Sequence, residues 1–136
     1  MIRGFPSHID LTVSDLGEST RFYDIVLTEL GFKRLLAENA PCWAISGDNA
    51  PVFSIALQQA RTQDRHNRYS AGLHHLAFHA ESHDEVDTFY DFLLRHSITV
   101  LDAPAEYDYT PGYYAVFFAD PDGIKLELVY EPNVRS

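Results

Sequence analysis

The chain has 136 residues, a length that suits one domain with a hydrophobic core of its own. Hydrophobic residues make up 46% of it and charged residues 22%, which is typical of a globular protein rather than a disordered one. The formal net charge of -10 argues against nucleic acid as a partner, because binding a run of phosphates requires clustered basic residues.

The sequence also restricts the kinds of site that the chain can build. Cys42 is the only cysteine, so neither an intrachain disulfide nor a thiolate metal cluster is expected. No apolar run approaches the roughly 20 residues of a membrane span, and Met1–Ser7 lacks the features of a secretion signal. We therefore expect a cytoplasmic protein with no membrane partner, in which nitrogen and oxygen atoms bind any metal ion.

The first predicted element is a strand from His8 to Val13, in which polar and apolar residues alternate. A helix is expected to begin at Asp15, because Glu18 completes a capping box, and to end at Gly31. Its predicted buried face consists of Phe22, Ile25, Val26 and Leu30. Three short strands should follow, at Phe32–Leu36, Trp43–Ser46 and Val52–Leu57, with a turn at 47–49. This order defines a βαβββ unit.

The polar stretch 58–70 then separates this unit from a second one with the same predicted order. A strand at Leu73–Ala80 precedes a helix that begins at Ser82, where Glu85 completes another capping box. The predicted buried face of this helix consists of Val86, Phe89, Leu93 and Leu94. Further strands are expected at Ile98–Leu101, Tyr113–Ala119 and Lys125–Tyr130, the last two joined by a tight turn at 120–123.

The two halves of the chain are similar in sequence as well as in predicted order. A shift of 67 positions places His75 on His8 and Phe89 on Phe22 without a gap. We therefore predict an α+β fold in which two tandem βαβββ units form a curved mixed sheet around a cavity with a metal site. The expected organisation is a single domain over 1–136, with unit one at about 5–58, a linker at about 59–71 and unit two at about 72–131.

Three residues are candidate metal ligands, because strand parity places them on the sheet face turned away from the helices. They are His8, His75 and Glu127. Two imidazoles and one carboxylate can hold a divalent ion and leave coordination positions open for a substrate. Taken alone, a histidine at a strand start such as His8 is more often a solvated or hydrogen-bonded side chain than a ligand, and Glu127 could be a surface charge.

Other polar residues are candidates for supporting roles around this site. His79, on the face of His75, and Tyr113 are tentative catalytic residues that could transfer a proton. His79 could instead line the cavity, and Tyr113 could serve in sheet packing. Arg65 and Arg68 could be solvated linker charges or could hold an anionic group of a substrate.

With these motifs the sequence resembles the vicinal oxygen chelate superfamily, which includes glyoxalase I, fosfomycin-resistance thiol transferases, extradiol dioxygenases and bleomycin-binding proteins. The resemblance covers 8–131 and rests on the segment 8–16 with Arg21-Phe22-Tyr23, on His75–Phe78, on 120–123 and on Leu126–Leu128. It implies one divalent metal ion (Zn, Mn, Fe, Ni or Co) bound by His8, His75 and Glu127. Glyoxalase I takes a further carboxylate from the last strand of the first unit, but here Val52–Leu57 contains no acid.

The resemblance implies a metal-dependent enzyme that acts on a small, oxygen-rich substrate. Three reaction classes stay open: lyase or isomerase chemistry of the glyoxalase kind, thiol addition to an epoxide, and dioxygenation. The alternatives are a metal-free small-molecule binding protein of the bleomycin-resistance type and a scaffold with a vestigial site. The resemblance also implies a homodimer, in which His8 of one subunit could meet His75 and Glu127 of the other.

Overall fold

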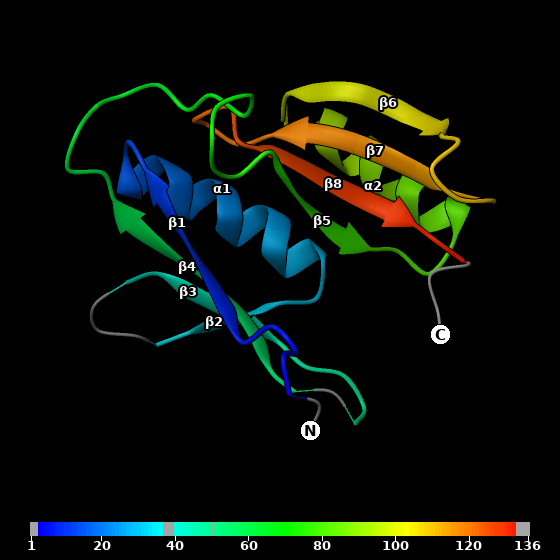
Figure 1. Cartoon of the computed structure of the whole chain (residues 1–136), viewed down its shortest axis with the longest axis horizontal. Coiled ribbons are helices and arrows are strands. Elements are labelled where there is room, and N and C mark those ends of the chain that lie inside the picture. Colours follow the sequence, from blue (N-terminus) through cyan, green and yellow to red (C-terminus); the bar gives the residue numbers. More distant parts are fainter. Residues whose placement is uncertain (1–2, 37–39, 50, 133–136) are drawn as a thin grey trace. The chain divides into compact units, whose positions relative to one another are not determined.

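The computed structural model describes residues 3–36, 40–49 and 51–132, and the chain divides into two compact units, Met1–Asp64 and Arg65–Ser136. Each unit consists of one helix packed against a four-stranded mixed sheet (Figure 1). The predicted α+β class with two βαβββ units is therefore confirmed. Within the described residues, neither helix has the length and the apolar composition that crossing a bilayer requires.

The first unit contains β1 (His8–Val13), α1 (Leu16–Glu29), β2 (Lys33–Leu35), β3 (Cys42–Ile45) and β4 (Phe53–Gln59). The strands are ordered β1-β4-β3-β2, with β1 parallel to β4 and the other pairs antiparallel. Alternation in β1 buries Leu11 and Val13 and leaves the even-numbered residues exposed, as the pattern predicts.

The second unit repeats this order with β5 (His75–His79), α2 (His83–Arg95), β6 (Val100–Glu106), β7 (Tyr114–Ala119) and β8 (Lys125–Tyr130). Its strands are ordered β5-β8-β7-β6, and β5 is parallel to β8. β6 continues five residues past its predicted end at Leu101 and includes Pro104. A proline is tolerated there because β6 is the outermost strand and its pairing with β7 is interrupted by shifts in register.

Both helices begin as predicted, and their ends show one difference. The Asp15 carboxylate accepts the Glu18 N–H at 3.0 Å, and the Ser82 hydroxyl accepts the Glu85 N–H at 3.1 Å. α1 ends at Glu29, and Gly31 follows two residues later with a φ of 97°, which glycine adopts easily. In α2 the same left-handed position falls on Ser97, with φ 55°. Because Ser97 is not a glycine, the sequence contains no clear signal for the end of α2.

The predicted buried faces of the helices are only partly right. In α1 the buried residues are Ser19, Tyr23, Val26 and Leu27. Ile25 is 43% exposed, and Phe22 is only half-buried. In α2 the burial of Val86, Phe89 and Leu93 is confirmed, but Phe92 takes the place predicted for Leu94, which is 52% exposed. The buried stripe of α1 is thus shifted around the helix by about one residue, a small rotation that packing decides rather than the pattern, whereas that of α2 differs only at its edge.

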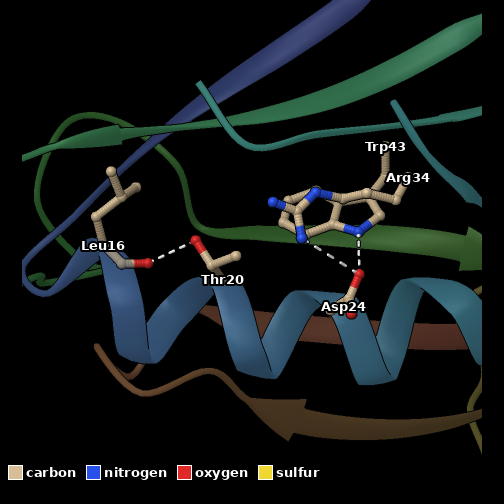
Figure 2. A network of polar contacts seen from close by, with 5 residues as sticks. All are labelled: Leu16, Thr20, Asp24, Arg34 and Trp43. Carbon is tan, nitrogen blue, oxygen red and sulfur yellow. Dashed lines mark hydrogen bonds and ion pairs between the residues drawn. The ribbon is translucent and has the colours of Figure 1, made fainter. Parts of the chain in front are cut away.

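A polar network explains why Tyr23 and not Phe22 turns inward in α1. The buried Trp43 on β3 donates its indole N–H to Asp24 at 2.9 Å, one residue after Tyr23 (Figure 2). Arg34 on β2 lies 3.6 Å from the same carboxylate, with its guanidinium 5.2 Å from the centre of the Trp43 ring. These contacts fix the rotation of α1 against its sheet, and they give the network a structural role.

Candidate functional site

The site is built on two adjacent strands of the second unit that carry predicted ligands, the outermost strand β5 and its neighbour β8. β5 and β8 are neighbours, and their register places His75 opposite Lys125 and Ala77 opposite Glu127. Cross-strand neighbours lie close enough for long side chains to meet along a diagonal. His75 and Glu127 do so, with Nε2 of the histidine 3.1 Å from Oε1 of the glutamate. The structure thus brings together two of the three predicted ligands, and we call them the His75–Glu127 pair.

The pair lies on the sheet face that is turned away from α2. Phe118 packs edge-on against Phe89 of α2, with ring centres 5.4 Å apart, so the odd-numbered residues of β7 project to the opposite face. Phe117 is one of these and is the cross-strand partner of Glu127. Its ring lies 6.2 Å from that of His75. The parity argument for Glu127 and His75 therefore holds in the structure.

Glu127 is a buried carboxylate, only 1% exposed. Tyr113 donates its hydroxyl to Oε2, the carboxylate oxygen that is not directed at His75. Desolvation raises the pKa of Glu127, and the Tyr113 hydrogen bond and the His75 imidazole act in the opposite direction. The pKa of Tyr113 is itself raised, by burial first and then by Glu127. Tyr113 therefore keeps its proton and orients Glu127, while a role of its own in catalysis stays a prediction.

His74 completes the surroundings of His75 and was not among the predicted site residues. The Nδ1 atoms of the two rings lie 2.7 Å apart. If Nε2 of His75 is to offer a lone pair, its Nδ1 must carry the proton and donate it to Nδ1 of His74. Desolvation and then the charges of His75, Lys125 and Arg68 lower the pKa of His74, which favours this acceptor state. His74 reaches His75 because it lies just before β5, where strict strand alternation does not yet apply.

An aromatic surface adjoins the His75–Glu127 pair on the same face. Tyr113, Ala115, Phe117 and Val129 form a buried cluster, and the half-buried Tyr107 packs against it. The ring of Tyr109 stacks on that of Tyr107 at 5.6 Å and is 69% exposed. A carboxylate and an imidazole thus lie beside an apolar surface that can cover a small substrate.

The remaining predicted site residues are His8, in the first unit, and His79, in the second. His8 begins β1 in the first unit and is exposed, with its Nδ1 2.9 Å from the Ser7 hydroxyl. His79 is exposed at the end of β5, where its register partner is Val129. Across 3–36, 40–49 and 51–132, no group of three or more His, Cys, Asp or Glu side chains is gathered closely enough to hold a metal ion. The roles of His8 and His79 therefore stay predictions.

The first unit has no counterpart of Glu127. In its sheet β1 and β4 are paired as β5 and β8 are, and Ala56 is the register equivalent of Glu127. The acid nearest in register is Asp10, opposite Ala56, and its Oδ2 already accepts a hydrogen bond of 2.9 Å from Gln58. The additional carboxylate of the glyoxalase I pattern is thus replaced by a methyl group.

Comparison with known proteins extends these findings. The family described as the Glyoxalase/Bleomycin resistance protein/Dioxygenase superfamily matches residues 6–128. The uncharacterized protein YqjT of Bacillus subtilis (strain 168) is 37% identical over 124 residues, which cover 90% of this chain and 95% of that protein.

Solved structures with the same arrangement are also known. The crystal structure of a "putative glyoxalase" from Bacillus halodurans has a TM-score of 0.76 and 30% identity, and the match covers 95% of this chain and 97% of that one. The genomically encoded fosfomycin resistance protein FosX from Listeria monocytogenes has a TM-score of 0.69 over 98% of this chain and 97% of its own. At 21% identity, this second likeness shows the fold alone.

Proposed function

We propose that this chain, which belongs to the Glyoxalase/Bleomycin resistance protein/Dioxygenase superfamily, is a divalent-metal-dependent enzyme that acts on a small, oxygen-rich substrate. The observation that carries the proposal is the His75–Glu127 pair, with 3.1 Å between Nε2 and Oε1. A carboxylate that is 1% exposed costs free energy to bury. Such buried ionisable groups are concentrated at functional sites, which supports a functional role for Glu127 beside the His75 imidazole.

The geometry of the pair fits a shared metal ion. Nitrogen and oxygen ligands bound at about 2.0–2.1 Å, at an angle of roughly 90–110°, are about 2.9–3.4 Å apart. The observed separation of 3.1 Å lies in this range. Each ligand also has a partner on its other polar atom, Tyr113 for Glu127 and His74 for His75. Such outer partners are a regular feature of metal sites, because they fix the orientation of the ligands.

We propose His75 and Glu127 as two of the ligands, with His8 as the predicted third. Imidazole and carboxylate ligands accommodate zinc, manganese, iron, nickel or cobalt. When bound, such an ion would act as a Lewis acid on a pair of adjacent substrate oxygens. In the chain itself, Tyr113 holds Glu127 in place, His74 sets the tautomer of His75, and the aromatic surface with Tyr107 and Tyr109 keeps water from one side of the substrate.

One of the three reaction classes, that of glyoxalase I, uses a fourth protein ligand. The pairing of β1 with β4 argues against it here. Ala56 occupies the position where a further carboxylate would be needed. Thiol transfer to an epoxide and dioxygenation require only three protein ligands in the pattern that the sequence resembles, so we propose one of these two classes ahead of the first. His79 is the proposed proton-transfer residue, because it is the next histidine of β5 on the face of His75.

A metal-free small-molecule binding protein is the second candidate function. It is favoured by the aromatic rings of Tyr107, Tyr109 and Phe117 beside the pair, which can cover a ligand whether or not a metal ion is bound. The same aromatic surface would then serve to hold a ligand without transforming it. Metal uptake distinguishes the two functions, because only the enzyme requires it.

The metal proposal predicts that the unmodified chain takes up about one ion when offered zinc, manganese, iron(II), nickel or cobalt, and that His75→Ala abolishes the uptake. His8→Ala tests the third ligand and should weaken uptake as well. Elemental analysis after removal of free metal is the measurement. His96→Ala is the matched control, since His96 caps α2 and should bind as the unmodified chain does. An unmodified chain that takes up none of the five ions would contradict the enzyme and favour the binding protein.

We also propose that the protein is cytoplasmic and forms a homodimer. β1 and β5 are the outermost strands of their sheets, and such edges offer unpaired backbone groups for association. The family resemblance supports the dimer. Light scattering on the purified protein tests it, and a mass of about 15.5 kDa at micromolar concentration would rule it out. Cell fractionation tests the location.

A further inference from the structure

We infer that Lys125 and Arg68 form an anion-binding subsite beside the His75–Glu127 pair, which selects small substrates that carry a carboxylate or a similar oxyanion. This inference deepens the proposed function, because it names the class of substrate for the same site. It rests on the placement of two cationic side chains, Lys125 on β8 and Arg68 in the segment before β5.

Lys125 is fixed close to the pair. It begins β8, two residues before Glu127 and on the same face, and it is the cross-strand partner of His75. Its Nζ lies 4.4 Å from the centre of the Phe117 ring, which itself packs against His75. A lysine that lies over an aromatic ring has less freedom than a solvated one. Its charge is therefore held at a defined point next to the proposed ligands.

Arg68 approaches the same histidines from the segment before β5. Its guanidinium lies 5.2 Å from the centre of the Tyr69 ring, and that ring meets the edge of His74 at 5.8 Å. The Nε atom of Arg68 is buried and has no hydrogen-bond partner among the described residues. Arg68 therefore reaches the His74–His75 step of the chain through Tyr69, and Lys125 reaches it as the cross-strand partner of His75.

The charge balance makes these two cations unusual. The chain has 20 acidic and only 10 basic residues, so a basic side chain should readily find a carboxylate. Within 3–36, 40–49 and 51–132, neither Lys125 nor Arg68 has a carboxylate within 4.0 Å. Glu127 is already bonded to His75 and Tyr113. A bound anion would supply the missing partner, with Arg68 as a planar donor and Lys125 as a point charge.

The inference is tested with benzoate and its neutral analogue benzamide, whose rings suit the aromatic surface beside the pair. Binding is measured by calorimetry on chelator-treated protein, so that no metal can contribute to the affinity. The unmodified chain should bind benzoate about tenfold more tightly than benzamide, because a charge-assisted hydrogen bond replaces a neutral one. Lys125→Gln should abolish this preference and Arg68→Gln should reduce it, whereas Lys125→Arg should keep it.

Two control variants are available in the chain. Lys33→Gln removes the only other lysine, on β2, and Arg61→Gln removes an exposed arginine from the polar stretch 58–70 that also holds Arg68. Both should retain the tenfold preference. Equal binding of the two probes by the unmodified chain would overturn the subsite, and so would a preference that survives both Lys125→Gln and Arg68→Gln.

Metal uptake by the same samples separates this inference from the proposed function. A chain that binds no metal but prefers benzoate through Lys125 would retain the subsite and lose the metal enzyme. A chain that binds metal through His75 but does not distinguish benzoate from benzamide would retain the metal site and lose the subsite. Thermal unfolding of Lys125→Gln and Lys125→Arg checks that both variants are folded.

Discussion

Replacement of Phe89 by alanine should lower the free energy of unfolding by about 3–5 kcal/mol, a typical loss for a buried phenylalanine. Phe89 is 4% exposed and lies between two other rings. Phe92 stacks on it with ring centres 5.5 Å apart, and Phe118 of β7 meets it edge-on at 5.4 Å. Truncation therefore removes two aromatic contacts and opens a cavity between α2 and its sheet.

Phe22 provides the matched comparison, because the sequence repeat equates it with Phe89. It is only half-buried on α1, so Phe22→Ala should cost roughly 1–2 kcal/mol. Urea unfolding of the two variants beside the unmodified chain gives both values. Equal losses at the two positions would mean that Phe22 is as deeply buried as Phe89. Phe22 and not Tyr23 would then turn inward in α1.

The comparison of these residues shows what the sequence could and could not predict about the fold. The starts of both helices were predictable, because a capping box involves only residues that are three apart. The rotation of α1 was not, because it depends on the contact of Trp43 with Asp24, which joins two distant parts of the chain. Likewise, the expected end of this strand at Leu101 is too early, because β6 lies at the sheet edge and can continue through Pro104 to Glu106.

The candidate site was predictable to a similar extent. Strand parity and the repeat were enough to propose that His75 and Glu127 meet, and the structure confirms this contact. The sequence suggests Tyr113 as a catalyst, and the structure adds that it donates a hydrogen bond to Glu127, so its role in catalysis stays a prediction. His74 does not emerge from the sequence because the expected strand Leu73–Ala80 places it on the parity opposite to His75, whereas β5 begins only at His75. The parity of β8 places Lys125 on the face of Glu127, but its location over Phe117 required coordinates.

The conversion of Glu127 to glutamine should separate the stability of the chain from its ability to bind metal. Metal affinity should fall on the order of 10²–10³-fold, since roughly 10–16 kcal/mol of binding free energy from four zinc ligands corresponds to about 2.5–4 kcal/mol for each. Glutamine keeps an oxygen that can accept the Tyr113 hydroxyl, so the hydrogen bond at that side of the residue survives.

The same substitution should make the metal-free chain more stable, by roughly 1 kcal/mol. Burial raises the pKa of Glu127, which means that the ionised carboxylate is less favourable in the folded chain than in water. The neutral amide does not incur this desolvation cost, and its NH2 group can donate to the lone pair of His75 Nε2, so that neighbour keeps a hydrogen-bond partner. Residues that serve a binding site often lower the stability of the fold, so a more stable Glu127→Gln variant would support a functional role for Glu127.

Thermal unfolding with chelator, followed by unfolding with excess zinc, measures both effects in one protein. Zinc should raise the unfolding temperature of the unmodified chain by more than that of Glu127→Gln, and the order of the two stabilities should reverse on its addition. Glu106→Gln changes an exposed residue at the end of β6. It is the control and should resemble the unmodified chain in both conditions. If Glu127→Gln is less stable than the unmodified chain in chelator, Glu127 contributes to folding in its own right, and its burial no longer supports a metal site.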